Sequence, residues 1–355
     1  MRLVNPGRAA IVLLAAAVLA APALAQEPVQ ERVTVGIVEV TLHASDRFGE
    51  PVVGLKAEDL TLLVDGKPAP IETLEWTSSV GSGDPVEDPA AVPADGAPAA
   101  GTDAGAGADA VVGRRLVLLF QWEIQGAKSE GHIRMARQAL EFIDTLKPDD
   151  QVAVMSFGSR LWLRQDFTSD HAKMRAAILS TLVPKNDQSG GHPSLAAAAR
   201  DGENATSIEK AFLAIGNALR PIPGSKAIVF FGWGIGTWTA ITKDTAGLGR
   251  MNYPREFDQA LKALQQAQAP VFTLDISAGH HQLEAGLERL SFETGGYYLP
   301  TYDFPRWAMK TAARALTGHY VLIFRPPTGR PHGPHEIRIE AAHGIRLLYR
   351  QQYDD

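Results

Sequence analysis

The side chains in this sequence with the most obvious capacity for chemistry are two adjacent histidines, His280 and His281, which follow Asp275 along the chain. Two imidazoles and a carboxylate are ligands that a transition metal accepts. The side chains of adjacent residues point apart, however, so both rings can rarely reach one ion. A solvated loop is therefore the favoured interpretation of this segment.

Other patterns that would indicate catalysis are missing from the sequence. It contains no Gly-x-Ser-x-Gly elbow, no His-Glu-x-x-His zinc helix and no phosphate-binding loop. We therefore expect a protein that is not an enzyme and that needs no cofactor, while a hydrolase with an unfamiliar site is a third interpretation. Four histidines near the C-terminus lack mutual ligand spacing, and we expect them to be exposed: His319, His332, His335 and His343.

The N-terminal residues indicate export. Two arginines precede an apolar run over residues 9–21, and small residues lead up to Ala25. This pattern predicts a secretory signal peptide over residues 1–25, and the run is too short for a membrane span of about 20 residues. We expect a periplasmic or secreted protein with no span after cleavage. With 0 Cys, disulfides and thiolate metal sites are excluded.

The charge distribution argues against nucleic acid as a partner. Lys and Arg number 34 and Asp and Glu 40, a net charge of −6. Residues 80–112 contain six of these acids and no Lys or Arg, among Ala, Gly, Pro and Val. Such a composition buries too little to offset backbone ordering, so we expect a disordered acidic linker. No basic stripe is present to neutralise phosphates, so nucleic acid and anionic lipid are poor candidates.

The linker separates two bodies that differ in pattern. Residues 26–79 form a β unit with a hairpin signal at Asp65-Gly66, and residues 318–355 form a β tail with runs at 320–324, 336–340 and 345–349. Each fragment has too few strands to close a core. We therefore predict that the two pair as one discontinuous, β-sandwich-like unit around the domain of residues 113–317.

Residues 113–317 alternate strands with helices. Residues 116–120 are an unbroken apolar run, as in a parallel strand buried on both faces. This alternation predicts an α/β fold, with a doubly wound, Rossmann-like sheet and one antiparallel hairpin at its edge. The expected strands are 116–120, 151–157, 161–167, 227–231, 271–276 and 297–299, and the expected helices are 132–146, 208–219, 254–267, 282–292 and one near 307–316.

This order of elements resembles the von Willebrand factor type A family, in its secreted bacterial form. The local phrases that carry the resemblance are Leu116-Val-Leu-Leu-Phe120, Arg134-Met-Ala-Arg-Gln-Ala-Leu-Glu-Phe142, Asp150-Gln-Val-Ala-Val-Met-Ser-Phe157 and Gln165-Asp-Phe-Thr-Ser-Asp170. β segments resembling residues 52–60, 64–68 and 318–322 flank the domain in that family. The resemblance covers the chain from about residue 33 onward, except for the linker. It implies that Asp275 anchors its loop through a hydrogen bond.

The resemblance also implies where a metal would lie. Family members hold a divalent ion with an Asp-x-Ser-x-Ser loop, a later Thr and an Asp after the fourth strand, because Mg²⁺ prefers such oxygen ligands. Here Gln121, Glu123 and Gln125 occupy the first loop, and Trp233 stands in place of the second Asp. Only Thr206 matches the family pattern. We therefore expect a degenerate site that holds no metal ion.

Thr206 has a second interpretation, because Thr206-Ser-Ile-Glu209 also fits a helix capping box, and capping is the favoured role. Three tryptophans follow the core strands that lead to the vacated site: Trp122 after the first, Trp233 after the fourth and Trp238 in the loop beyond. Ligands of open α/β sheets bind at the carboxyl ends of the strands, where we expect these indoles to converge. They either fill the pocket as core or leave one ring exposed beside Glu123 as a contact anchor.

Together these features predict a non-enzymatic, metal-independent protein-binding or scaffolding module of the bacterial envelope or exterior, whose partner is an envelope protein. The alternative is a carbohydrate or cell-wall binder that uses exposed tryptophans at the same rim. The candidate binding rim consists of Gln121, Trp122, Glu123, Gln125, Thr206, Trp233 and Trp238.

Overall fold

The computed structural model describes residues 37–47, 49–78, 113–122, 126–183, 195, 201, 205–240, 249–327, 332–341 and 344–354. The expected signal peptide and acidic linker lie outside these residues. Within them, no helix combines the length and the apolar character needed to cross a membrane.

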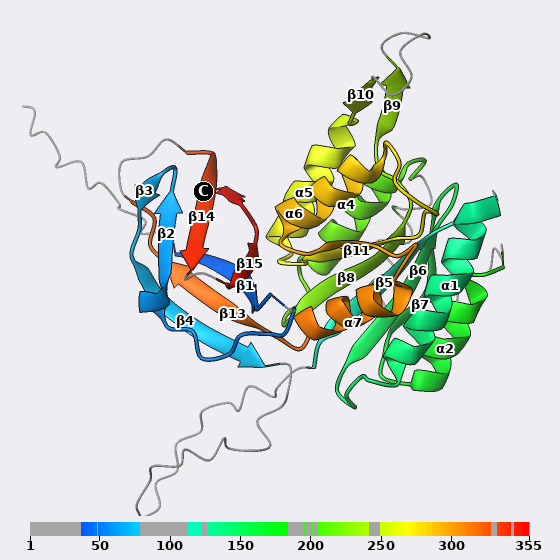
Figure 1. Cartoon of the computed structure of the whole chain (residues 1–355), viewed down its shortest axis with the longest axis horizontal. Helices are drawn as coiled ribbons and strands as arrows, with labels where there is room; N and C mark the ends of the chain where they lie inside the picture. The colour runs from blue at the N-terminus through cyan, green and yellow to red at the C-terminus, as the bar shows by residue number, and fades with distance from the viewer. Residues whose placement is uncertain are drawn as a thin grey trace, which may run out of the picture. The chain divides into compact units, whose positions relative to one another are not determined.

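A six-stranded sheet forms the centre of the α/β domain (Figure 1). Its order is β12-β11-β8-β5-β6-β7, and every neighbouring pair is parallel except β6 and β7. The expected α/β class with one antiparallel hairpin at the edge is confirmed. The strands are β5 Arg115–Gln121, β6 Gln151–Phe157, β7 Leu161–Thr168, β8 Lys226–Gly232, β11 Val271–Asp275 and β12 Tyr298–Pro300.

Helices cover both faces of this sheet (Figure 1). Neighbouring residues of a strand point to opposite faces, so β8 sends Phe231 to one helix layer and Phe230 to the other. Phe231 stacks on Phe120 with ring centroids 4.3 Å apart, and Phe230 meets Phe212 edge-on at 4.9 Å. One layer consists of α1 Gly126–Ile143, α2 His171–Ser180 and α7 Pro305–Ala315, and the other of α4 Ile208–Leu219, α5 Arg255–Gln266 and α6 Glu284–Thr294.

Helix α1 begins earlier than expected, at Gly126 rather than at residue 132. The polar residues of its first turns hid this start from the hydrophobic pattern. Helix α1 also passes close to the end of β11, because a Cβ on Gly131 would lie 1.8 Å from the carbonyl oxygen of Ile276. Only glycine therefore allows α1 to pass so close to the end of β11.

The flanking segments build two four-stranded antiparallel sheets around one core. Strand β13 lies between β1 and β4, and β14 pairs with β2 so that Ile337 faces Val64. The predicted pairing of the N-terminal β unit with the C-terminal tail is confirmed. The strands are β1 Val38–Ser45, β2 Leu60–Val64, β3 Lys67–Pro68, β4 Ile71–Ser78, β13 Gly318–Phe324, β14 Pro334–Ala341, β15 Arg346–Tyr349 and β16 Gln352–Asp354.

Three residues, His335, His319 and Trp238, differ in burial or secondary structure from what the sequence predicts. His335 is buried, at 4% exposed, because its Nδ1 lies 2.7 Å from Oδ2 of Asp65. His319 is half-buried, and burial lowers its pKa to about 4. Trp238 belongs to a strand rather than a loop, since β9 Thr237–Ala240 pairs with β10 Gly249–Asn252 in a hairpin. His332 is exposed as expected, and His343 lies outside the described residues.

Candidate functional site

The carboxyl-terminal ends of the parallel strands β5, β8, β11 and β12 lie at one end of the sheet, where ligands of open α/β sheets bind. We call this end of the sheet the carboxyl edge. Three buried polar side chains, Gln121, Glu209 and Asp275, turn inward at this edge. Each one bonds to a loop that follows a strand. Their contacts decide what the edge can present to a ligand.

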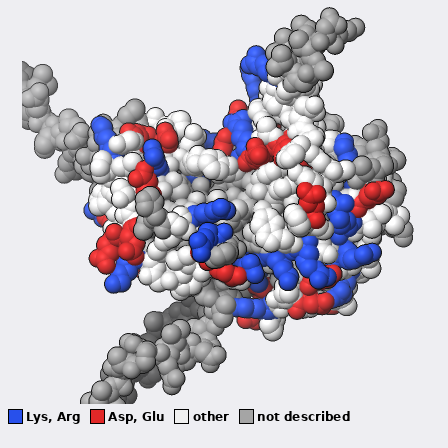
Figure 2. All heavy atoms as spheres, viewed as in Figure 1, with Lys and Arg blue, Asp and Glu red and all other residues white. Residues whose placement is uncertain are grey.

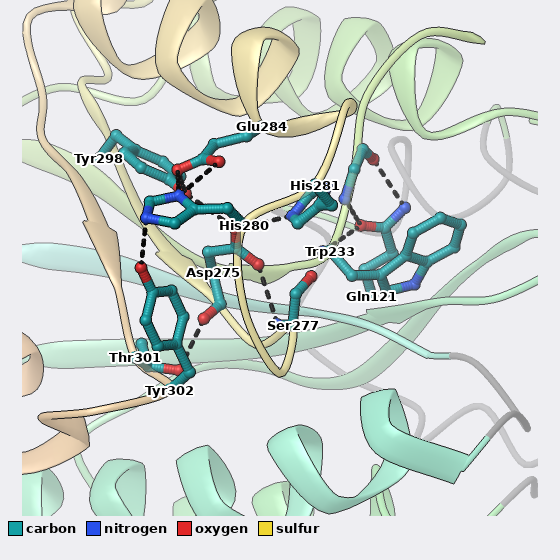
Figure 3. A network of polar contacts seen from close by, with 11 residues as sticks. Gln121, Trp233, Asp275, Ser277, His280, His281, Glu284, Tyr298, Thr301 and Tyr302 are labelled. Atoms are coloured by element: carbon teal, nitrogen blue, oxygen red, sulfur yellow. Dashed lines mark hydrogen bonds and ion pairs between the residues drawn. The ribbon is translucent and has the colours of Figure 1, made fainter. Parts of the chain in front are cut away.

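Gln121 ends β5 and is 4% exposed. Its Oε1 accepts hydrogen bonds from the backbone N–H groups of Trp233, at 2.9 Å, and Gly234, at 3.3 Å. Its Nε2 donates to the carbonyl oxygen of Gly234 at 3.0 Å (Figure 3). An aspartate could accept the first two bonds but could not donate the third. Gln121 therefore clamps the loop after β8 instead of facing outward.

Glu209, in the first turn of α4, is 4% exposed and accepts a hydrogen bond from the backbone N–H of Gly236 at 2.8 Å. It therefore holds the same loop at a second point. The expected capping box starting at Thr206 is wrong, because the N-cap is Ser207, whose hydroxyl accepts from the backbone N–H of Lys210 at 3.4 Å. Thr206 itself is exposed.

Asp275 ends β11 and is 1% exposed. Its Oδ1 accepts from the backbone N–H of Ser277 at 2.9 Å, and its Oδ2 lies 2.8 Å from Nε2 of His281 and 2.8 Å from the Tyr298 hydroxyl. Burial alone would raise the pKa of Asp275, but hydrogen bonds from His281 and Ser277 outweigh it, so the pKa is lowered. The expected loop-anchoring role of Asp275 is confirmed.

Tyr298 joins two carboxylates through one hydroxyl group. Its oxygen lies 2.8 Å from Oδ2 of Asp275 and also 2.8 Å from Oε1 of Glu284. Burial and the charge of Asp275 raise the pKa of Tyr298, so the phenol keeps its proton as the donor in this network. His280 bonds to Glu284 through Nδ1, at 3.1 Å, and to the Tyr302 hydroxyl through Nε2, at 2.9 Å (Figure 3).

The order Glu284, His280, Tyr302 places a carboxylate, an imidazole and a hydroxyl in a row, as in a nucleophilic relay. Burial, followed by the charge of Asp303, raises the pKa of Tyr302, so this phenol keeps its proton at neutral pH. Among the residues with described positions, no group of three His, Cys, Asp or Glu side chains is placed to hold a metal. The hydrogen bonds of Ser277, His280 and His281 hold the loop between β11 and α6 to Asp275 and Glu284.

A cavity of about 300 Å³ opens at this edge, lined by Trp233, Lys128 and residues 277–283. The ammonium of Lys128 lies 3.4 Å from the centroid of the Trp233 ring, a cation–π contact. Trp233 is half-buried and packs on the core beneath α1, α2 and α7. Its Nε1 is buried without a hydrogen-bond partner among the described residues.

The remaining rim residues lie on separate elements. Trp122 is half-buried and lies against Gly158, and Trp238 lies against Gly249 in the β9–β10 hairpin. In the described part of the chain, no ring contact joins these two indoles to each other or to Trp233. Glu123 and Gln125 lie outside the described residues. A binding role for the rim stays a prediction.

Sequence reasoning missed Glu209, Tyr298 and Glu284. Glu209 stands where an acidic residue of a capping box would stand, which concealed its bond to the loop after β8. Tyr298 lies in a strand of three residues, too short for an alternation pattern to show which side chains turn inward. A signal was present only for Asp275, an acid that directly follows four strand residues without charge.

No family model and no curated protein matches the sequence. Among solved structures, the chain is similar to a von Willebrand factor type A protein from Catenulispora acidiphila, with 13% identity and a TM-score of 0.38 over 68% of this chain and 65% of that one. The PilB minor pilin from Streptococcus sanguinis matches with 13% identity and a TM-score of 0.36, over 59% of this chain and 62% of the pilin.

A third similar structure is proximal thread matrix protein 1 from the mussel byssus, with a zinc-occupied MIDAS motif. It matches with 13% identity and a TM-score of 0.38, over 58% of this chain and 46% of that one. Each of these three matches spans less than two thirds of the other protein.

Proposed function

We propose that the chain is a non-enzymatic binding module that engages a protein partner through the carboxyl edge of its six-stranded sheet, without a metal ion. The observation that carries this proposal is the clamp formed by Gln121, whose amide oxygen and nitrogen are both bonded to the backbone of Trp233 and Gly234. A neutral side chain engaged in this way has no ligand oxygen directed at an ion.

The polar network around Asp275 supports the non-enzymatic part of the proposal. Its carboxylates are bonded to His281, Tyr298 and His280, and its phenols have raised pKa values. These hydrogen bonds hold the loop between β11 and α6 in place, and the raised pKa values keep both phenols protonated and therefore weakly nucleophilic at neutral pH. The edge thus has a fixed shape and a cavity suited to contact rather than reaction.

The partner and the compartment are further parts of this proposal. The signal peptide expected over residues 1–25 directs the chain to the envelope or the exterior, so the proposed partner is an envelope protein. Carbohydrate binding is less well supported, because sugar-stacking platforms need open ring faces. Trp122, Trp233 and Trp238 are each only partly exposed.

The test is capture of partners from native envelope extract by the full chain and by two edge variants, Lys128→Glu and Trp122→Ala. We expect both variants to capture less partner at unchanged melting temperature, because their side chains lie at the rim. Lys262→Glu on α5 makes the same charge change away from the edge and serves as the matched control. Equal capture by all variants would exclude this edge, and binding to a glycan array without protein capture would favour the carbohydrate alternative.

A further inference from the structure

Helix α7 presents exposed aromatic side chains that the proposed edge does not include. Phe304, directly before the helix, is 68% exposed, and Trp307, in its first turn, is 52% exposed. Trp122, Trp233 and Trp238 are all less exposed than these two. Large aromatic side chains left in solvent next to one another are a frequent mark of a contact surface.

The exposed side of α7 is also basic along its length. The helix contains Arg306, Lys310 and Arg314, and neither Asp nor Glu occurs in it. Trp307, Lys310 and Arg314 follow one another at spacings of three and four residues, which places them on one face. Figure 2 shows Lys and Arg side chains gathered over this helix.

The ion pairs that the basic residues of this face form with acidic residues are exposed and therefore weak. Nη2 of Arg306 lies 3.6 Å from Oε2 of Glu141, and Nη2 of Arg314 lies 3.0 Å from Oε1 of Glu50. Exposed pairs of this kind contribute about 1 kcal/mol or less. Lys310 has no ion pair within the residues that the structure describes. An incoming carboxylate would therefore have to break only weak ion pairs.

A cationic cavity adjoins the C-terminal half of the helix. It measures about 240 Å³, and its charged lining residues are Arg114, Lys147, Lys310 and Arg314, without a carboxylate. Arg114 is itself paired with Asp150. Burial and the positive charge of Arg114 lower the pKa of Lys147, even though neighbouring aspartates act in the opposite direction. The cavity therefore has room for an anionic side chain beside four cationic side chains, of which Arg114 and Arg314 are already paired with carboxylates.

The distance between the aromatic end and the cavity limits the shape of a ligand. Trp307 and Arg314 are separated by about 10 Å along the helix, at a rise of about 1.5 Å per residue. An extended peptide covers that distance in about three residues, at about 3.3 Å each. The surface thus fits a short segment in which an apolar side chain and an acidic side chain are about three residues apart.

Charge also favours a peptide over a membrane as the ligand of α7. The six acids of residues 80–112 account for the net charge of −6, so the rest of the chain is close to neutral and lacks the excess of positive charge that an extended anionic membrane attracts. A short acidic segment meets only the local charges, because salt screens interactions beyond about 8–10 Å. A protein segment is therefore the better match to this helix.

We propose that α7 docks an extended acidic segment of a protein partner, with an apolar side chain against Phe304 and Trp307 and a carboxylate in the cavity beside Lys310. This inference rests on the proposed function, since it assumes that the chain binds a protein. It adds a second contact surface and names the chemistry of what that surface binds.

The test uses the full chain and a fluorescein-labelled peptide in a Gly-Ser background, with one Phe three residues from a pair of Glu. Anisotropy titration should show binding to the wild type, and Trp307→Ala and Lys310→Glu should each weaken it about tenfold. Replacing Glu by Gln in the peptide should have the same effect. The matched controls are Phe292→Ala, at a side chain 54% exposed on α6, and Lys262→Glu on α5, and both should bind like the wild type.

Failure of the wild type to bind the peptide, or equal losses in the control variants, would overturn the inference. Sedimentation with phosphatidylglycerol vesicles but not phosphatidylcholine vesicles, abolished by the two α7 substitutions without peptide binding, would identify a membrane surface instead. If an envelope protein is captured equally by the wild type and both α7 variants, this inference fails while the proposed function stands. If the wild type captures no envelope protein at all, the proposed function itself fails.

Discussion

Gln121, Glu209 and Asp275 each hold a loop at the carboxyl edge through backbone hydrogen bonds. The sequence shows that Gln121 departs from the metal-site pattern, but the clamp was not predictable, because its partners lie 112 and 113 residues away. The burial of His335 was missed for the same reason, since Asp65 is 270 residues distant. The loop-anchoring role of Asp275 followed from the family resemblance, and two of its hydrogen-bond partners, Ser277 and His281, lie close to it in the sequence.

Replacing Gln121 with Ala should lower the free energy of unfolding by about 3 kcal/mol, because it leaves two backbone N–H groups and one carbonyl without their partner. Urea denaturation measures this change. Gln282→Ala, at an exposed glutamine of the same edge, is the control and should change stability by less than about 0.5 kcal/mol. If Gln121→Ala lowered the free energy of unfolding as little as the control does, the proposed role of Gln121 in holding the loop would be contradicted.

His132 is 3% exposed and stacks on Phe120. Its Nε2 donates to the hydroxyl of Thr181, whose own proton goes to the carbonyl oxygen of Ile178. Burial lowers the pKa of His132 from 6.5 to about 4, so the unfolded chain binds more protons between these pH values. The stability from neutral His132 is therefore present above pH 6.5 and is lost as the pH falls to about 4.

Urea denaturation at several pH values between 6.5 and 4 measures this effect. Over that range the free energy of unfolding of His132→Gln should fall by about 3 kcal/mol less than that of the wild type. Burial also lowers the pKa of His43, to about 3, and of His319, to about 4, so the variant should keep part of the acid sensitivity. Identical pH slopes in both proteins would show that His132 is not the titrating group.

At the scale of elements, apolar runs predicted the buried strands β5, β8 and β11 because both faces of those strands are covered. Strand β4 was not predicted, since its sequence Ile-Glu-Thr-Leu-Glu-Trp-Thr-Ser has no strict alternation and it lies at a sheet edge. The hairpin β9–β10 was missed because it stands outside the main sheet, where no core imposes a pattern. The pairing of the two flanking segments was predictable because neither segment alone has enough strands to close a core.

Removing residues 318–355 should make the N-terminal β unit sensitive to protease, because β13 is the strand that pairs with both β1 and β4. Limited proteolysis followed by mass spectrometry measures the cut sites. The control is a chain that ends at Gln351, which loses only β16 and should stay protected. Protection of residues 37–78 in the longer truncation would contradict the observed pairing.

At the scale of the molecule, the chain combines a central α/β domain with a sandwich made from both of its flanking segments. The sequence predicted this division because the α/β alternation and the β-rich ends have different hydrophobic periods. It did not predict the exposed aromatic and basic face of α7, since exposure depends on which side of that helix the sheet covers.

Mg²⁺ and Mn²⁺ at millimolar concentration should leave the melting temperature unchanged, because Gln121 and Trp233 stand at expected ligand positions and Gln121 is fully engaged. A ligand present at about 100 times its dissociation constant would add about 2.7 kcal/mol to stability. Differential scanning fluorimetry with and without EDTA detects such a gain. An EDTA-reversible rise in melting temperature would show that the chain binds a metal.

The most direct test of metal-independent protein binding is the amount of envelope protein that the full chain captures in EDTA compared with Mg²⁺. We expect equal capture in the two buffers, together with reduced capture by Lys128→Glu, whose ammonium lies on the Trp233 ring at the edge. Loss of capture in EDTA that Mg²⁺ restores, or no capture in either buffer, would contradict the account.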